Sequence, residues 1–305
     1  MTKFSGTGVA LVTPFTQTGD IDFTALRRLV KYVTDGGVQF LVALGTTGEP
    51  ATMSRDEKKK VLEVIVEENA GKLPLVIGMG GNNTAALIEY ALEIEQEFKP
   101  DAFLSVTPYY NKPHQEGLYQ HYARLAEAVN TDIILYNVPG RTAINMLPAT
   151  TLRLAADFEN IVAVKEAFDS MAQCMELVKL RANMGLETSF SIMSGDDMLG
   201  MSQMAVGFDG VISVAANALP KAFSDIIDLA GKARMEEARK LHYTWLDIMN
   251  MHFDEGNPAG VKHSLVLQGV CEGNVRLPLV VASEALQARL ANAWEKARES
   301  LVVSR

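Results

Sequence analysis

Eight short apolar runs recur along the chain, separated by longer stretches in which apolar residues have helical spacing. They span residues 8–13, 39–44, 74–78, 102–106, 132–136, 161–165, 190–194 and 210–214. Several are apolar at nearly every position, which is typical of parallel strands covered on both faces. Alternating strands and helices predict a parallel sheet, and eight strands are the number that closes a barrel. We therefore expect an α/β fold, a (β/α)8 TIM barrel. A doubly wound open sheet is the alternative, because periodicity alone does not separate the two.

The stretches between the runs carry helix signals of their own. Ser54 and Glu57 form a capping-box pattern ahead of an apolar stripe that ends near residue 70. After about Leu219 the strand signals stop, and residues 221–250, 258–268 and 283–300 have helical patterns. We predict a barrel over residues 1–225 and a small C-terminal helical extension over residues 226–305.

Composition limits the class of protein. The chain has 305 residues, of which 48% are hydrophobic, enough to build a core. Its net charge is −9 and it has no basic stripe, so we expect no nucleic-acid partner and no membrane docking. No apolar run reaches the length of a membrane span, and the N-terminal residues show no signal-peptide pattern. Cys174 and Cys271 are isolated thiols without CxxC spacing, which favours a reducing compartment and a cytoplasmic location.

Polar segments directly follow five of the predicted strands. They are GTTGE at 45–49, TPYYN at 107–111, YNVPGRT at 136–142, KEA at 165–167 and SGDD at 194–197. In a barrel the carboxyl ends of all strands meet at one rim, where the active sites of this fold lie. We therefore expect these segments to surround one site.

Lys165 is the most informative single residue, because it ends an apolar run. Strand alternation places it on the same face as Ile161 and Ala163, at the edge of an apolar interior. Desolvation there favours the neutral amine, which is the nucleophile in Schiff-base chemistry. The alternatives are an ion pair with a carboxylate such as Glu166, or a side chain that extends to solvent.

Further polar groups belong to the same predicted rim. Tyr136, Tyr110 and Thr46 carry hydroxyls that relay protons if they lie close together, or that simply cap strands. The glycines of the 45–48 turn allow backbone N–H groups to approach a carboxylate, although a tight turn without a ligand has the same pattern. Arg141 follows a Pro-Gly turn and is suited to a bidentate pair with a substrate carboxylate, or to a surface ion pair.

The pair Asp196 and Asp197 raises the question of a metal site. The five histidines show no ligand spacing, so a helix N-cap is the favoured role for the pair. We expect no metal and no cofactor.

Six segments together resemble one family. GTTGE, TPYYNKP, YNVPGRT, VKEA, SGDD and GVISV, in this order and spacing, are similar to the dihydrodipicolinate synthases, which belong to the pyruvate-dependent class I aldolases related to N-acetylneuraminate lyase. The resemblance runs from ALVTPF near the N-terminus to NPAGVKHSL near the C-terminus. Six ordered motifs are far more specific than any one of them.

The resemblance implies a lyase that condenses pyruvate with L-aspartate 4-semialdehyde in lysine and diaminopimelate biosynthesis. It implies that Lys165 forms the imine with pyruvate. It also implies that Tyr136 relays protons through Thr46 and Tyr110, with Tyr110 reaching the site from a neighbouring subunit. The family is usually a homotetramer, a dimer of dimers.

The same resemblance assigns the groups that bind substrate. Thr46, Thr47 and the backbone near Gly195 and Ile212 would hold the pyruvate end. Arg141 would take the carboxylate of L-aspartate 4-semialdehyde.

Alternatives within the group differ in the second substrate. Sialic acid lyases typically have GSTGE and lack an arginine at the position of Arg141, so this sequence favours the synthase. Aldolases of keto-deoxy sugar acids share the fold and the imine chemistry, and a non-catalytic sensor of a keto acid is a further alternative.

One departure from the family concerns regulation. Members inhibited by lysine often carry a Ser, two His and a Glu in an allosteric pocket. Here the corresponding residues are Pro50, Arg55, Lys58 and Ala86, while Asn82 and Tyr109 fit the family pattern. Ala86 removes a carboxylate that would pair with the lysine amine, so we expect weak or absent feedback inhibition.

Overall fold

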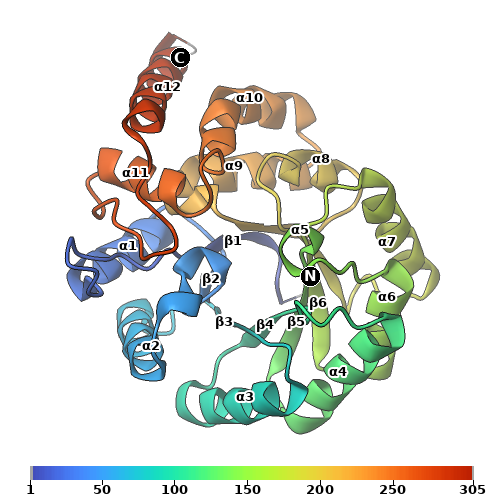
Figure 1. Cartoon of the computed structure of the whole chain (residues 1–305). Helices are drawn as coiled ribbons and strands as arrows, with labels where there is room; N and C mark the ends of the chain where they lie inside the picture. The colour runs from blue at the N-terminus through green and yellow to red at the C-terminus, as the bar shows by residue number, and fades with distance from the viewer. Residues whose placement is uncertain (1–2, 304–305) are drawn as a thin grey trace.

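The computed structural model describes residues 3–303 and contains a closed barrel of eight parallel strands (Figure 1). The strands are β1 (Gly6–Ala10), β2 (Phe40–Ala43), β3 (Leu75–Gly80), β4 (Ala102–Val106), β5 (Asp132–Asn137), β6 (Ile161–Glu166), β7 (Ser191–Ser194) and β8 (Gly210–Ser213). Each strand pairs with the next, and β8 pairs back onto β1 with Gly210 opposite Gly6. This closure confirms the TIM barrel and excludes the open sheet.

Helices follow the strands and form the outer ring seen in Figure 1, except for the short helix α5, which lies inside the ring at the end of β5. They are α1 (Phe23–Asp35), α2 (Arg55–Asn69), α3 (Thr84–Phe98), α4 (Gln115–Ala128), α5 (Pro139–Thr142), α6 (Pro148–Asp157), α7 (Met171–Asn183), α8 (Gly200–Ala205) and α9 (Pro220–Gly231). The predicted capping box is present at the start of α2, where the Ser54 side chain accepts the N–H of Glu57. Within residues 3–303, no helix is long and apolar enough to cross a membrane.

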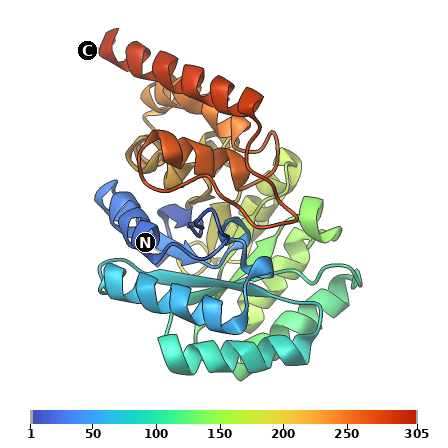
Figure 2. The same cartoon turned by 60° about the vertical axis from the view of Figure 1, so that its left-hand side comes forward.

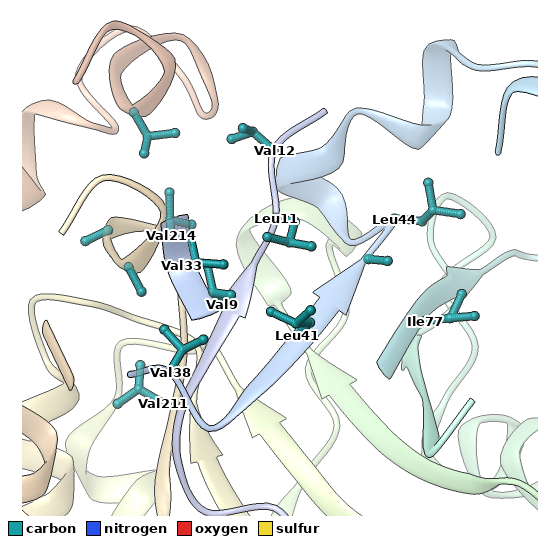
Figure 3. Close-up of a cluster of buried hydrophobic side chains, with 14 of the residues drawn as sticks. Val9, Leu11, Val12, Val33, Val38, Leu41, Leu44, Ile77, Val211 and Val214 are labelled. Atoms are coloured by element: carbon teal, nitrogen blue, oxygen red, sulfur yellow. The ribbon is translucent and has the colours of Figure 1, made fainter. Parts of the chain in front are cut away.

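Two apolar layers hold the barrel together. The inner layer fills the barrel and consists of Phe4, Ala10, Phe40, Val42, Val76, Ala102, Leu104, Ile134, Tyr136, Val138, Ala163, Met193 and Ile212. Phe4 precedes β1 and meets Phe40 edge to face at 5.4 Å between ring centroids, so the interior is closed at its N-terminal end. The outer layer lies between strands and helices, and Figure 3 shows part of it around Val9, Leu11 and Leu41. The barrel is therefore a filled core rather than a channel.

The face assignment for β6 is partly wrong. The register between β5 and β6 shifts, with Ile133 opposite Ile161 and Ile134 opposite Ala163. Such an irregularity inserts one extra residue, so side chains on either side of it no longer alternate simply. Ala163 belongs to the inner layer as expected, but Ile161 packs in the outer layer. Lys165 lies beyond the bulge and keeps the inward face of Ala163.

The C-terminal extension consists of α10 (Met235–Met251), α11 (Ala259–Leu267) and α12 (Glu284–Val303), and α12 projects from the barrel in Figure 2. The predicted single helix over 221–250 is in fact two, because the chain turns after α9 with Ala233 at a φ of 58°. Trp245 of α10 and Trp294 of α12 pack edge to face, and Trp294 Nε1 donates to Ser264 Oγ of α11 at 3.2 Å. These contacts join the three helices. The proposed division at residue 225 falls within α9 and stays a prediction.

Candidate active site

A cavity of about 690 Å³ opens at the carboxyl ends of β2, β3, β4 and β5. Thr46, Tyr136 and Arg141 line it, together with Asn257 from the segment between α10 and α11. The cavity also extends over α2 and α3 and is lined there by Pro50, Arg55, Lys58, Asn82, Ala86 and Tyr90. Polar groups from three of the predicted rim segments are therefore gathered around one opening.

Lys165 lies near the carboxyl end of β6 and is 6% exposed. Its Cα is in register with Tyr136 on β5 and Met193 on β7. Its Nζ lies 4.6 Å from the centroid of the Tyr136 ring. Within residues 3–303 it has no ion pair and no hydrogen bond. The amine is thus held in place by packing, with no partner that a carbonyl compound would have to displace.

Gly195 leaves the space that Lys165 occupies. A Cβ at this position would lie 2.9 Å from Lys165 Cε and 2.5 Å from the Cβ of Ala167. The Gly195 N–H donates to Glu166 O at 2.7 Å, which ties the end of β7 to the end of β6. Any side chain here would displace the lysine, so this glycine is required by the close approach.

Glu166 is buried on the opposite face of β6 and does not pair with Lys165, which removes that alternative. One carboxylate oxygen accepts from Asn137 Nδ2 at 2.8 Å and from Phe168 N at 3.0 Å, and the other accepts from Gln173 Nε2 at 3.1 Å. Burial raises the pKa of Glu166 to about 7, and these hydrogen bonds partly oppose the rise. The carboxyl group fastens the ends of β5 and β6 to α7.

The turn after β2 contributes both predicted threonines. Thr46 is exposed to the cavity, whereas Thr47 is buried and its Oγ1 accepts from Asn257 Nδ2 at 2.9 Å. Arg141 also reaches the cavity, from α5 directly after β5. Tyr109 lines the cavity, but Tyr110 is not among its lining residues and is 88% exposed.

The remaining predicted groups lie on β8 and after β7. Ile212 is fully buried in the inner layer on β8. Neither aspartate caps a helix, because α8 begins at Gly200 with Leu199 as its N-cap. Asp196 Oδ1 instead accepts the N–H groups of Met198 and Leu199 in the preceding turn. Among residues 3–303, no group of three His, Cys, Asp or Glu side chains is placed to hold a metal.

Asp197 turns away from solvent and joins β7 to β8. Its Oδ2 accepts from Val214 N at 3.1 Å and from Ala215 N at 2.7 Å. Burial raises the pKa of Asp197 to about 6, and hydrogen bonds from Ser213 and Ala215 oppose the rise. The carboxyl group holds the rim segment just beyond Ile212.

An ion pair that the sequence did not predict lies beneath the rim. Lys262 of α11 donates to Glu49 Oε1 at 2.6 Å, and both side chains are almost completely buried. Burial lowers the pKa of Lys262, while the Glu49 carboxylate opposes this. Lys262 lies in the NPAGVKHSL segment that resembled the family, but helical spacing gave no sign that a lysine there is buried.

The fold and the site define a class: a (β/α)8-barrel protein with a free amine at the carboxyl rim, suited to imine chemistry with a carbonyl substrate. A sequence model of the Dihydrodipicolinate synthetase family matches residues 3–297. The chain belongs to this family.

Individual relatives agree over nearly the whole chain. A 4-hydroxy-tetrahydrodipicolinate synthase of Flavobacterium psychrophilum is 50% identical over 290 residues, which is 95% of this chain and 97% of that protein. The dihydrodipicolinate synthase structure from Thermotoga maritima has a TM-score of 0.93 at 39% identity, covering 97% of this chain and 99% of that one. A chloride-inhibited dihydrodipicolinate synthase from Acinetobacter baumannii, complexed with pyruvate, has a TM-score of 0.90 at 38% identity, covering 96% and 98%.

Replacing Glu166 with Gln tests the buried carboxyl group. The raised pKa means that the folded state binds the proton more tightly than the unfolded state does. This stabilisation is present below about pH 4.5 and is lost as the pH rises to about 7. Its upper limit is on the order of 3 kcal/mol, since one pKa unit corresponds to about 1.4 kcal/mol. Because Gln does not titrate, the melting temperature of Glu166→Gln should rise relative to wild type between about pH 5 and pH 8.

Thermal unfolding at one protein concentration measures this difference. Glu63→Gln on the exposed face of α2 is the matched control and should show no such trend. A pH-independent difference between Glu166→Gln and wild type would contradict the account.

Proposed function

We propose that this chain condenses pyruvate with L-aspartate 4-semialdehyde to 4-hydroxy-tetrahydrodipicolinate, through a Schiff base on Lys165, in lysine and diaminopimelate biosynthesis. The observation that carries the proposal is the unpaired amine of Lys165 at the rim of a filled barrel, beside Tyr136 and Gly195. Membership of the family and the names of the relatives support the choice of substrates. No cofactor is needed, because the amine supplies the electron sink as an imine.

The first half of the reaction makes an enamine. The Lys165 amine attacks C2 of pyruvate and water leaves, which forms the imine. The Thr47 hydroxyl and the backbone near Gly195 and Ile212 hold the pyruvate carboxylate. The cationic imine acidifies C3, and loss of a C3 proton gives the enamine.

The second half forms the carbon–carbon bond and frees the enzyme. C3 attacks the aldehyde carbon of L-aspartate 4-semialdehyde, and the aldehyde oxygen takes a proton to become the hydroxyl. Tyr136 and Thr46 relay these protons together with Tyr110 of the partner subunit. Arg141 at the cavity wall binds the aldehyde's carboxylate. The substrate amine then displaces Lys165 from C2, which closes the ring.

We assign the protein to the cytoplasm and to a homotetramer built as a dimer of dimers. The exposure of Tyr110 supports the oligomer, because this side chain is 88% exposed and is not among the residues that line its own cavity. In such an assembly that side chain is available to the site of a neighbour.

The direct test follows NADPH loss with both substrates and a coupling dihydrodipicolinate reductase. Wild-type protein should consume NADPH only with both substrates, and borohydride with pyruvate should leave a covalent adduct on the peptide that contains Lys165. Lys165→Ala should abolish both signals, whereas Lys221→Ala, an exposed lysine paired with Asp225, should retain both. An adduct without condensation would favour an aldolase of sugar acids over the proposed synthase. The absence of any adduct would favour a non-catalytic protein that binds a keto acid.

Subunit mixing tests the role of Tyr110. Lys165→Ala and Tyr110→Phe should each be strongly impaired alone. When the two are unfolded together and refolded, mixed dimers contain one site with both intact residues, so about a quarter of wild-type activity should return. No recovery above the separately refolded variants would show that Tyr110 acts within its own chain or not at all.

Lysine inhibition should be weak or absent. Arg55, Lys58 and Ala86 line the same cavity as Asn82 and Tyr109, so this wall carries two cations and lacks the carboxylate that an added lysine needs. Condensation rates should be unchanged by submillimolar L-lysine at fixed substrate concentrations. Strong inhibition in that range would contradict the proposal.

A further inference from the structure

The segment between Leu44 and Glu49, which we call the rim turn, is held in a strained conformation. Leu44 and Glu49 have φ values of 54° and 56°, in the left-handed region that residues with a Cβ avoid. The turn also crosses β3 closely, since a Cβ on Gly78 would lie 2.5 Å from Leu44 O. Non-glycine residues keep such a conformation only where surrounding contacts determine it.

Those contacts come from the C-terminal extension. Lys262 Nζ of α11 donates to Glu49 Oε1 at 2.6 Å and to Asn274 O at 2.7 Å. The N–H of Arg276 donates to Glu49 Oε2 at 3.1 Å. Both carboxylate oxygens at the end of the rim turn are thereby held by residues more than 200 positions away in the sequence.

A second contact joins the extension to Thr47 in the same turn. Asn257 Nδ2 donates to Thr47 Oγ1 at 2.9 Å, so the oxygen acts as acceptor and the hydroxyl hydrogen is free to donate elsewhere. Asn257 is 7% exposed and belongs to the segment that leads into α11. The extension therefore contacts the rim turn at two places, the Glu49 carboxylate and the Thr47 hydroxyl.

We propose that Lys262 and Asn257 are positioning residues, through which the C-terminal extension holds the rim turn so that the Thr47 hydroxyl faces the pyruvate carboxylate. This inference rests on the proposed function. Lys262 is fully buried and is not among the residues that line the cavity, so it acts through its hydrogen bonds to Glu49 and to Asn274 O. The extension is on this account a component of the pyruvate site.

The competing explanation is that the ion pair only stabilises the fold, and a second ion pair, formed by a buried arginine, offers a control. Arg181 of α7 binds Asp209, and Arg181 also donates to Phe190 O and Gly207 O. These contacts lie at the amino ends of β7 and β8, away from the rim. Arg181→Met and Lys262→Met each leave a carboxylate without its cation, but only Lys262→Met frees the rim turn.

The test measures how much pyruvate gives half-maximal borohydride-trapped adduct on Lys165. Lys262→Met should raise this concentration by at least about tenfold, because misplacing a binding group by about 1 Å costs up to about a hundredfold. Arg181→Met should stay within about twofold of wild type even where it lowers the melting temperature as much. Equal values for the two variants would overturn the proposal.

Asn257→Ala is a second test variant, which keeps the ion pair between Glu49 and Lys262. If Lys262→Met does not fold, Asn257→Ala alone tests whether the extension positions the rim turn. Losing one hydrogen bond to Thr47 should raise the half-saturating pyruvate concentration by about fivefold with little change in melting temperature. An unchanged concentration in Asn257→Ala would overturn the role of the extension. Absence of any adduct in wild-type protein would instead refute the proposed function.

Discussion

Closure of the parallel sheet between β8 and β1 is the constraint on which the rest of the molecule depends. It puts the carboxyl ends of all eight strands around one opening above an interior filled with side chains, so residues at the ends of different strands come together at that rim. Lys165 occurs at this boundary, beyond the last inner-layer residue of β6, with Tyr136 in register on one side and Met193 on the other. Its position thus follows from the architecture, while Gly195 supplies the room that its side chain requires.

The barrel does not complete the site alone. The turn after β2 has left-handed residues at both of its ends, and the ion pair between Glu49 and Lys262 joins it to α11. A buried pair contributes little net stability, since desolvation offsets the attraction between its charges. On our proposal the ion pair acts by fixing the position of the Glu49 carboxylate, and with it the end of the turn. Glu166 and Asp197 act similarly on neighbouring rim segments, where buried carboxyl groups tie strand ends to α7 and to the segment after β8.

Much of the fold and of the site could be predicted because it is encoded locally. The hydrophobic periodicity of strands and helices is visible in short stretches of sequence. In a barrel of parallel strands, the residues that follow each strand all lie at the same rim. The rim position of Lys165 is predictable in this way. That Ile161 and Lys165 face opposite sides of the sheet is not, because it results from a bulge, and a bulge depends on pairing between strands. The break at Ala233 has no proline to mark it. The pair between Glu49 and Lys262 spans 213 positions, and a helical pattern does not show which lysine is buried.

On the proposed function, one rim combines the amine of Lys165 with a carboxylate-binding turn held by the extension. A crystal structure of the protein reduced with borohydride in the presence of pyruvate tests this most directly. We expect continuous density from Lys165 Nζ to C2 of the bound group, with its carboxylate within hydrogen-bond distance of Thr47 Oγ1 and with Asn257 still donating to that oxygen. An adduct on another lysine, or a carboxylate directed away from the turn, would contradict it.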